Sequence, residues 1–373
     1  MKIAINATIL GKKPSGLGVY TTNIIKGIES NLSTDDQLLV YTSTPEHFEG
    51  SKKIQIVKTP KYMSPEYGKI GGLTRFIWNQ IILPFRVKKD KVDIIYSTTH
   101  HGMFLSPIKQ ILTVHDLLPM IFPGQHKLQY YYFKYILPLL LKKSSRLVTV
   151  SSNTKEDILK SYKFNSSKID VVYNSFEKTH FKNSTSSKYK DMLGEYILFL
   201  GASYPHKNLI RTIKAFNKIK AKHQDLNLVV AGGRADYKDQ VKEHFKNDDE
   251  ALDRVVFLDY IPYSDLPILY SNATLFIYPS LYEGFGIPPI EAMACGCPTI
   301  VSNTSSLPEV CNNASIYFNP EDINEISSTI INVLKDNQIQ KDLIKKGYEN
   351  CNRFSWDMSA SKVYTLIKGD GSN

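Results

Sequence analysis

Residues 278–303 read YPSLYEGFGIPPIEAMACGCPTIVSN, and this stretch decides the fold that we expect for the chain. Two carboxylates, Glu283 and Glu291, lie eight residues apart on either side of a Gly-Phe-Gly turn, and the second opens an apolar helical run. Apolar strand-like runs precede and follow. The start of a helix presents backbone N–H groups and a dipole that favour phosphate, whereas the two acids can accept hydrogen bonds from hydroxyl groups. The pattern therefore predicts a ligand that carries both phosphate and sugar.

The same alternation of short apolar strands and helices runs through both halves of the chain. Helical stretches of 10 to 15 residues between strands are typical of parallel sheets in Rossmann-like domains. We therefore predict an α/β protein with two such sheets. Strands are expected at residues 2–8, 37–43, 54–59, 93–99, 110–116, 146–152 and 167–173, and then at 195–202, 226–233, 254–260, 275–280 and 298–303.

The length of 373 residues exceeds that of a usual single core and favours two domains. We predict a first domain over residues 1–173 and a second over 195–353. The polar, Ser- and Thr-rich stretch within 174–194 predicts a linker between them. Residues 354–368 are amphipathic and predict a terminal helix.

The basic excess of the chain lies entirely in its first half. Residues 1–185 hold 26 Lys and Arg against 13 Asp and Glu, whereas residues 186–373 hold 20 against 23. This asymmetry suggests an anionic partner for the first half, either nucleic acid or an anionic membrane surface, although a merely solubilising excess is the alternative. Residues 75–91 and 126–146 mix aromatic, aliphatic and basic side chains. They fit either an interfacial helix or a core helix with lysines reaching outward.

Several common chemistries find no support in the sequence. No D-x-D pair, Walker A loop, H-E-x-x-H or G-x-S-x-G motif is present. The four cysteines have no His or Cys cluster nearby to complete a zinc site, and we expect them to be free, buried thiols. The start of the chain alternates like a strand and shows no secretory signal. The apolar run at 130–141 is too short to span a bilayer. We therefore expect a soluble or peripheral cytosolic protein without a metal.

The string around Glu283 and Glu291 resembles the E-x7-E signature of the retaining GT-B glycosyltransferases, in particular glycosyltransferase family 4. The resemblance extends over nearly the whole chain. It implies two Rossmann-like domains that face each other across a cleft, an acceptor-binding first domain, a donor-binding second domain, and a last helix, 354–368, that crosses back to the first. It further implies transfer of a hexose from a nucleoside diphosphate sugar to a hydroxyl acceptor, without a cofactor.

Among members of that family, the chain looks most like the mannosyltransferases of bacterial surface polysaccharide assembly. A saccharide acceptor is therefore expected, and the basic first half suggests that it is lipid-linked and reached on an anionic membrane. The nature of the base (GDP, UDP or dTDP) and of the sugar stays open. A nucleotide-sugar epimerase or a phosphorylase-like enzyme on the same fold is the second hypothesis. A nucleic-acid-binding protein is the third, although no known module for it is present.

Two candidate sites lie in the first half. Gly16 and Gly18 follow the first strand and open a helix, where glycine lets a backbone approach a phosphate closely, although a plain turn is the alternative. The resemblance places this loop beside the donor diphosphate or the acceptor. His115 ends the strand 110–116, at the edge where ligands bind in α/β domains. The resemblance gives it contact with the donor sugar, with Asp116 orienting it or capping the next turn.

Further candidates lie in the second half, after its first and third strands. Lys207 stands at a strand-to-helix junction, where its charge can neutralise a leaving diphosphate. Relatives pair this lysine with an arginine; here His206 replaces it, or Arg211 serves instead. The resemblance places Tyr260 and Ile261 against the nucleotide base.

The resemblance also assigns roles within the Glu283 string. Glu291 would bind the ribose hydroxyls, and Glu283 would serve the hexose and the reaction centre. Gly284 would belong to the donor-binding site, and the turn residues Phe285 and Gly286 would present backbone N–H groups to the sugar and phosphate. In the absence of metal ligands, helix N-termini and Lys207 would carry the charge of the diphosphate.

Overall fold

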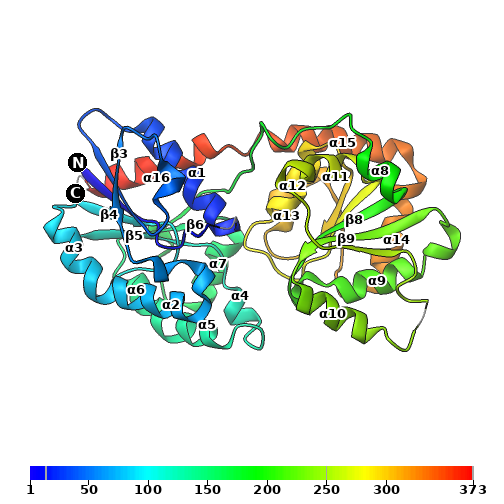
Figure 1. The fold of residues 1–373 in the computed structure, drawn as a ribbon, viewed down its shortest axis with the longest axis horizontal. Helices are drawn as coiled ribbons and strands as arrows, with labels where there is room; N and C mark the ends of the chain where they lie inside the picture. The colour runs from blue at the N-terminus through cyan, green and yellow to red at the C-terminus, as the bar shows by residue number, and fades with distance from the viewer. Residues whose placement is uncertain (13–14, 249, 372–373) are drawn as a thin grey trace. The chain divides into compact units, whose positions relative to one another are not determined.

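The computed structural model describes residues 1–12, 15–248 and 250–371, which form two compact units. Unit 1 comprises the described residues of Met1–Asn174 and Ser355–Asn373, and unit 2 comprises those of Ser175–Phe354. Each unit is built on one parallel sheet with helices on both faces (Figure 1). The prediction of an α/β protein with two parallel sheets is confirmed.

The sheet of unit 1 has seven strands in the order β3-β2-β1-β4-β5-β6-β7. All neighbours are parallel, and Ile3 of β1 pairs with Leu38 on one side and Ile94 on the other. Strands buried on both faces read as continuous apolar runs, which explains why the sequence marks them clearly. Their bounds are β1 Lys2–Asn6, β2 Gln37–Thr42, β3 Ile54–Lys58, β4 Ile94–Ser97, β5 Lys109–Val114, β6 Arg146–Thr149 and β7 Ile169–Val171.

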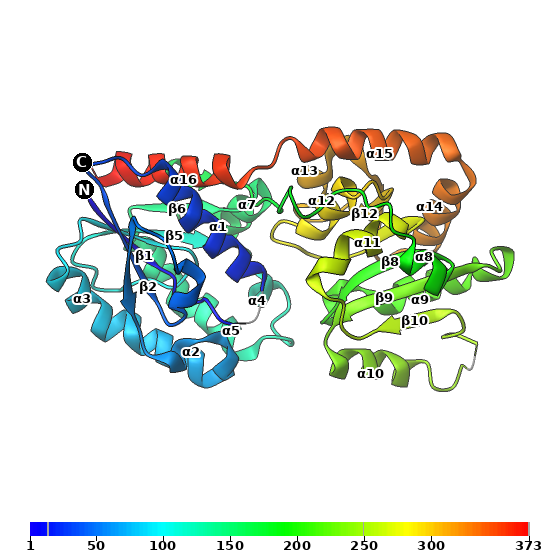
Figure 2. The ribbon, with the colours of Figure 1, turned by 45° about the horizontal axis from the view of Figure 1, so that its top comes forward.

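Different helices cover the two faces of this sheet (Figures 1 and 2). On one face, Tyr20 of α1 hydrogen-bonds Tyr96 of β4, and α16 packs beside α1. On the other, Trp78 and neighbouring helical residues share a core with Ile95. The helices are α1 Gly16–Asn31, α2 Gly68–Ile77, α3 Leu83–Lys89, α4 Leu118–Ile121, α5 Lys127–Tyr131, α6 Leu137–Lys142, α7 Ser152–Ser161 and α16 Trp356–Gly371. The π-helical turns η4 Trp78–Ile82 and η5 Tyr132–Ile136 join α2 to α3 and α5 to α6.

The terminal helix α16 is held in unit 1 by packing and by charge. Gly27 of α1 lies so close to α16 that a Cβ there would stand 2.4 Å from Cβ of Ala360. The buried carboxylate of Asp36 accepts hydrogen bonds from Tyr364, Lys368 and the N-terminal ammonium. Burial alone would raise the pKa of Asp36, but these three donors lower it to about 2. Helix 356–371 therefore completes the unit that the first 174 residues begin.

The sheet of unit 2 has six strands in the order β10-β9-β8-β11-β12-β13. They are β8 Glu195–Ala202, β9 Leu226–Gly233, β10 Val255–Leu258, β11 Leu275–Tyr278, β12 Thr299–Ser302 and β13 Ile316–Phe318. The helices of this unit are α8 Lys188–Leu193, α9 Leu209–Asn217, α10 Ala235–His244, α11 Leu266–Asn272, α12 Ile287–Ala294, α13 Leu307–Cys311, α14 Ile323–Lys335 and α15 Asn337–Cys351.

Alternate side chains of β8 and β11 point to opposite faces of the unit 2 sheet. Phe199 and Ile277 pack with α9, α10 and α14 in one large core. On the other face, the Phe276 ring packs edge-on against Tyr270 of α11. Residues 175–194, at the start of this unit, contain α8 and bury Phe181 against Tyr270. The four cysteines are all free and buried, as expected from their spacing.

Gly27 gives a test of the α1–α16 packing. In an open helix, Gly→Ala stabilises by about 0.5–1 kcal/mol, but the Gly27→Ala methyl group would overlap Ala360. We expect a net loss of about 1–3 kcal/mol, measured as faster amide hydrogen exchange in α16. Gly369→Ala, which meets no atom within 4 Å, is the control and should leave exchange unchanged or slower. Equal exchange in both variants would contradict close packing at Gly27.

Candidate active site

The loops after β8 and β11 bring two predicted site residues together. These strands are neighbours in the sheet, although β9 and β10 separate them in sequence, so the chain changes its winding direction between them. Ligands of open parallel sheets bind at such a switch point, beyond the carboxyl ends of the strands. Lys207 ends the short 3₁₀ turn η7 Pro205–Lys207 after β8, and Glu283 lies in the loop after β11.

Lys207 and Glu283 form an ion pair that is largely shielded from solvent. Lys207 Nζ lies 2.5 Å from Glu283 Oε1, and the two side chains are 18% and 14% exposed. Nζ also donates to the Tyr278 hydroxyl at 3.0 Å. Burial opposes charge on both partners, but their mutual attraction outweighs it, so that the pKa of Lys207 is raised and that of Glu283 is lowered. The site therefore holds a protonated amine and an ionised carboxylate in contact.

Asn208 explains why Lys207 is held at this point. Its backbone is left-handed, with φ of 66°, a conformation that asparagine tolerates better than most residues. Its buried amide donates to the carbonyls of Pro279 at 3.2 Å and Pro320 at 2.7 Å. The loop after β8 is thereby tied to the loops after β11 and β13, and the position of the lysine follows from it.

The Gly-Phe-Gly turn is fixed by the loop after β12. Ser305 accepts from the Glu283 N–H at 2.9 Å, and Ser306 donates to the carbonyl of Phe285 at 2.8 Å. Gly286 has φ of 104°, and a Cβ there would lie 2.7 Å from Leu307. Only glycine fits that conformation and that space. The sequence reading assigned the turn but missed the two serines that hold it.

Helix α12 begins directly after the turn, with Gly286 as its N-cap residue. Pro288 and Pro289 occupy the first turn, and proline has no backbone N–H. The N–H groups that this helix start can offer an anion therefore come from Ile287 and from the Gly-Phe-Gly turn. Two prolines also pre-set the helical backbone at little entropic cost.

Glu291 lies one helical turn further along α12. Its carboxylate accepts a hydrogen bond from the Tyr270 hydroxyl at 2.9 Å, and burial raises its pKa to about 7. Tyr260 and Ile261 follow β10, and Tyr260 is 81% exposed. Tyr263 lies near Glu291: burial chiefly raises its pKa, and the carboxylates of Glu177 and Glu291 add to the effect. The loop predicted to meet the base thus approaches the acid predicted to meet the ribose.

The structure offers a cation that the sequence reading missed. His206 is buried, and its ring stacks on Tyr204 at a centroid distance of 5.8 Å. The Arg234 guanidinium lies 5.0 Å from the centroid of the same Tyr204 ring and donates to the Tyr204 hydroxyl. Arg211 instead donates to Asn208 at 3.1 Å. Arg234 follows the Gly-Gly end of β9, a position at the ligand-binding edge that could have marked it.

The predicted residues of unit 1 gather at the corresponding edge of its own sheet. The ring of Tyr20, two residues after Gly18 in α1, packs edge-on against His115 at 4.6 Å. Gly16 and Gly18 form the first turn of α1, where Gly18 N–H donates to the cap residue Ser15. Here β1 and β4 are neighbours, so the unit 1 sheet also has its switch point at this edge.

His115 is held in one tautomer. Its Nε2 lies 2.8 Å from the carbonyl of Thr98, which can only accept, so that Nε2 carries the proton. Burial lowers the pKa of His115 to about 4 despite this bond. The neutral ring therefore keeps Nδ1 as an acceptor, suited to a hydroxyl group. Asp116 caps the next turn by accepting from the Leu118 N–H at 2.9 Å.

The sequence reading also missed the histidine pair after β4. The rings of His100 and His101 lie 4.5 Å apart in a tilted arrangement, and His100 packs on Tyr132. Burial chiefly lowers the pKa of both, to about 3 for His100 and well below the ordinary value for His101, and the charge of Arg75 adds to the effect. Both rings are neutral and lie at the same switch point as His115. Their place directly after the strand 93–99 was the available signal.

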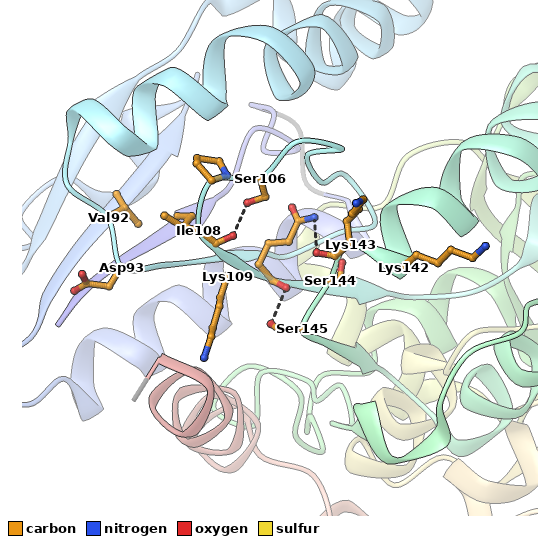
Figure 3. Close-up of a pocket in the computed structure, with 11 residues that line it drawn as sticks. Val92, Asp93, Ser106, Ile108, Lys109, Lys142, Lys143, Ser144 and Ser145 are labelled. Carbon is orange, nitrogen blue, oxygen red and sulfur yellow. Dashed lines mark hydrogen bonds between the residues drawn. The ribbon is translucent and has the colours of Figure 1, made fainter. Parts of the chain in front are cut away.

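A cavity lies at the opposite edge of the unit 1 sheet, at the amino ends of its strands (Figure 3). This cavity, of about 670 Å³, is lined by the residues that precede or start β4, β5 and β6, among them Asp93, Lys109 and Ser145. Two of its hydroxyl groups are bonded within the protein: Ser106 donates to the carbonyl of Ile108, and Ser145 to that of Gln110. Because ligands of open parallel sheets bind beyond the carboxyl ends of the strands, this cavity at the amino ends is a poor candidate for the site.

The described part of the chain offers neither a cluster of metal ligands nor a helix suited to cross a membrane. Within residues 1–12, 15–248 and 250–371, no three His, Cys, Asp or Glu side chains gather as a metal site would require. Across those same ranges, no helix combines the length and the apolar character that are needed to cross a bilayer.

Two family models match consecutive parts of the chain. Residues 14–178 match the model described as Glycosyltransferase Family 4, and residues 181–350 match the one described as Glycosyl transferases group 1. The O-antigen chain mannosyltransferase RfbU of Salmonella typhimurium is 34% identical over 337 residues, which cover 88% of this chain and 90% of that protein. The chain belongs to glycosyltransferase family 4.

Other relatives and solved structures agree with this assignment. The O-antigen chain mannosyltransferase B of Escherichia coli is 25% identical and covers 99% of this glycosyltransferase and 100% of its own length. Sucrose-phosphate synthase of Thermosynechococcus elongatus has a TM-score of 0.78 at 19% identity, with 99% and 98% of the two chains covered. Anabaena HepE, solved with UDP and glucose, has a TM-score of 0.74 at 18% identity, with 99% and 100% covered. The fold of the glycosyltransferase is thus GT-B, as predicted.

Tyr278 provides a test of how Lys207 is positioned. Tyr278→Phe removes the hydroxyl that shares the ammonium with Glu283 but keeps the ring beneath it. A hydrogen bond to a charged group contributes about 1.5–3 kcal/mol, so that we expect kcat/KM for transfer to fall about tenfold or more. Tyr348→Phe, at an exposed ring, is the control. Unchanged kinetics in both variants would show that the hydroxyl does not position Lys207.

The pKa of Glu291 provides a test of its predicted role in donor binding. Because this pKa is about 7, half of the protein holds a neutral acid there near neutral pH. If the carboxylate accepts hydrogen bonds from a ribose, the ligand binds the charged form preferentially. Below pH 7, affinity should therefore increase by up to about tenfold for each unit by which the pH is raised, and above pH 7 it should level off. Calorimetry with the donor sugar measures this, and Glu291→Gln should flatten the profile. A profile that is identical in the variant would contradict this role.

Proposed function

We propose that this glycosyltransferase moves a hexose from a nucleoside diphosphate sugar to a hydroxyl of a saccharide acceptor, with retention of configuration at the anomeric carbon. Mannose is the favoured hexose. The mannosyltransferase names of its Salmonella and Escherichia relatives support mannose and an O-antigen type of polysaccharide. The donor is a substrate, and the protein uses no cofactor or metal. The observation that carries the proposal is the buried Lys207–Glu283 pair at the switch point of the unit 2 sheet.

The donor is proposed to lie along the carboxyl edge of unit 2. Lys207 neutralises the diphosphate, assisted by the N–H groups of Gly284, Phe285 and Gly286, while His206 lines the same loop. Glu283 accepts hydrogen bonds from the hexose, and Glu291 accepts them from the ribose diol. Tyr260 and Ile261 cover the base. Lys207 can donate to a dianionic diphosphate and to Glu283 at the same time. The buried carboxylate therefore keeps its partner when the donor binds.

The reaction is proposed to exchange one bond for another on one face of the sugar. The bond from the anomeric carbon to the diphosphate oxygen breaks, and a bond to the acceptor oxygen forms. The acceptor's proton passes to the leaving diphosphate, so that no protein base is consumed. Negative charge that builds up on the leaving oxygen is stabilised by Lys207, which needs no reorganisation because Tyr278 and Glu283 already hold it.

Unit 1 is proposed to bind the acceptor. His115, neutral and with Nδ1 as acceptor, contacts a hydroxyl of the transferred sugar, and Gly16 and Gly18 allow close approach of a ligand at the start of α1. The acceptor is lipid-linked, and the protein works in the cytoplasm at the inner face of the membrane. The basic first half serves this anionic surface and not a nucleic acid.

Epimerase and phosphorylase-like chemistries on the same fold are the competing functions. An epimerase would convert the nucleotide sugar without any acceptor, whereas a phosphorylase-like enzyme would transfer the sugar to inorganic phosphate. The family assignment favours transfer to a saccharide over either of them. A panel of GDP, UDP and dTDP sugars, each alone, with inorganic phosphate and with a mannose-terminated acceptor, separates the three by their products.

We expect one donor, a mannose donor, to be hydrolysed slowly alone and used quickly with the acceptor. Lys207→Ala should lower kcat/KM by about 10²- to 10³-fold, which corresponds to about 2.7–4 kcal/mol. Lys214→Ala, at an exposed lysine of α9, is the matched control. EDTA should leave the rate unchanged.

Three results would contradict this account. Release of an epimer or a sugar phosphate without a glycoside would favour the competing chemistries. Loss of activity in EDTA, with recovery in magnesium or manganese, would refute the metal-free part. Normal turnover in Lys207→Ala would remove the lysine from the reaction.

A further inference from the structure

Two helical segments of unit 1 carry apolar side chains on their solvent side. The first runs without a break through α2, η4 and α3, and the second through α5, η5 and α6. Their exposed apolar residues recur every three or four positions and are 44–74% exposed. They are Ile70, Leu73, Ile77, Ile81 and Phe85 on the first segment, and Leu128, Tyr131, Tyr135 and Leu139 on the second.

The opposite sides of these segments are already used in the core. Trp78, Leu83 and Val87 pack under the first segment, and Phe133 and Leu137 pack under the second. An ordinary surface helix has one apolar stripe facing the core and a polar face toward water. Here the outer rows are apolar as well, and nothing in the fold of unit 1 requires them.

The two segments lie side by side and form one surface. Phe76 of α2 packs edge-on against Tyr132 of η5 at a ring distance of 6.4 Å, and against Phe104 at 6.2 Å. Both views show α2, α3 and α5 along the face of the sheet opposite α1 and α16 (Figures 1 and 2). We call the nine exposed residues named above, with the lysines between them, the docking face.

The charge of the docking face has one sign. Neither residues 67–89 nor residues 127–142 contain an Asp or a Glu. Exposed lysines are interleaved with the apolar rows, namely Lys69, Lys88, Lys89, Lys127, Lys134 and Lys142. Lys134 Nζ stands 5.3 Å from the ring centre of Tyr135, so that the amine and the aromatic ring are presented together. Apolar, aromatic and cationic groups mixed in this way suit the boundary between lipid headgroups and acyl chains.

We infer that the docking face inserts its apolar side chains into the boundary region of an anionic bilayer, while its lysines pair with lipid phosphates. The inference rests on the proposed function for its use, which is to reach a lipid-linked acceptor, and it names the surface and the partner. The underside of the same segment leads to the ligand-binding edge: Tyr132 packs on His100, and its hydroxyl donates to the His100 carbonyl. A bilayer on the outer side thus lies about one helix diameter, roughly 10 Å, from the switch point of the unit 1 sheet.

Flotation with lipid vesicles tests the inference. The wild type should bind vesicles of phosphatidylcholine mixed with phosphatidylglycerol and should bind pure phosphatidylcholine weakly. Added salt should weaken binding without abolishing it, because screening removes the lysine contribution and leaves the apolar one. The double variants Ile81→Ser/Phe85→Ser and Leu128→Ser/Leu139→Ser should each lower the partition coefficient about tenfold or more. The double variant Lys88→Glu/Lys89→Glu should lower the partition coefficient only at low salt, where the charges are not screened.

The controls separate docking from folding and from catalysis. Met358→Ser removes an equally exposed apolar side chain from α16, on the opposite face, and should bind vesicles like the wild type. All variants should keep the wild-type melting temperature and the wild-type rate of donor hydrolysis without vesicles. A wild type that hydrolyses no donor would refute the proposed function while leaving the vesicle result to stand alone.

Three outcomes would overturn the inference. The wild type could bind neutral and anionic vesicles equally, or neither. The docking-face variants could bind as tightly as Met358→Ser. Finally, sedimentation could show a wild-type dimer that Ile81→Ser/Phe85→Ser makes monomeric without any vesicle binding, which would assign the face to a second copy of the chain.

Discussion

The contact on which the unit 2 site depends is the ion pair between Lys207 and Glu283. It joins the loops of two strands that are adjacent in the sheet but separated by β9 and β10 in the chain. A buried pair is stable only if its remaining hydrogen-bonding capacity is satisfied. Tyr278 meets part of that requirement by accepting from Lys207 Nζ, and Ser305 fixes the loop itself by accepting from the Glu283 backbone N–H. The arrangement places one protonated amine at the switch point before any ligand arrives.

The surrounding loops can be understood as the means of holding that pair. Asn208 has a left-handed backbone, and its side-chain amide hydrogen-bonds two neighbouring loops. Gly286 has a positive φ, and Leu307 leaves no room for a Cβ there, so that glycine is required on both counts. Burial raises the pKa of Glu291 to about 7, and the hydrogen bond from the Tyr270 hydroxyl offsets only part of that effect. Unit 2 thus keeps Glu283 charged beside its lysine and leaves Glu291 close to half-protonated near neutral pH.

Much of the architecture could be predicted because buried parallel strands are short, continuous apolar runs. All seven strands of unit 1 were expected, whereas β13, Ile316–Phe318, was not predicted, although β7 is equally short. The Glu283 string was found because its residues are consecutive. Tyr278, Ser305, Asn208 and Arg234 were missed because their roles arise from strand order and loop contacts. His100 and His101 were missed as well, although their place directly after the predicted strand 93–99 could have marked them.

The most direct test of the account is a crystal structure of the protein with an intact nucleoside diphosphate sugar. We predict that the diphosphate lies within hydrogen-bonding distance of Lys207 Nζ and of the N–H groups of Gly284–Gly286, with the ribose hydroxyls on Glu291. Lys207 should then be shared between Glu283 and phosphate. Density for the nucleotide at any other place, including the cavity at the amino ends of β4 and β5, would contradict the central claim that the switch point of unit 2 is the donor site.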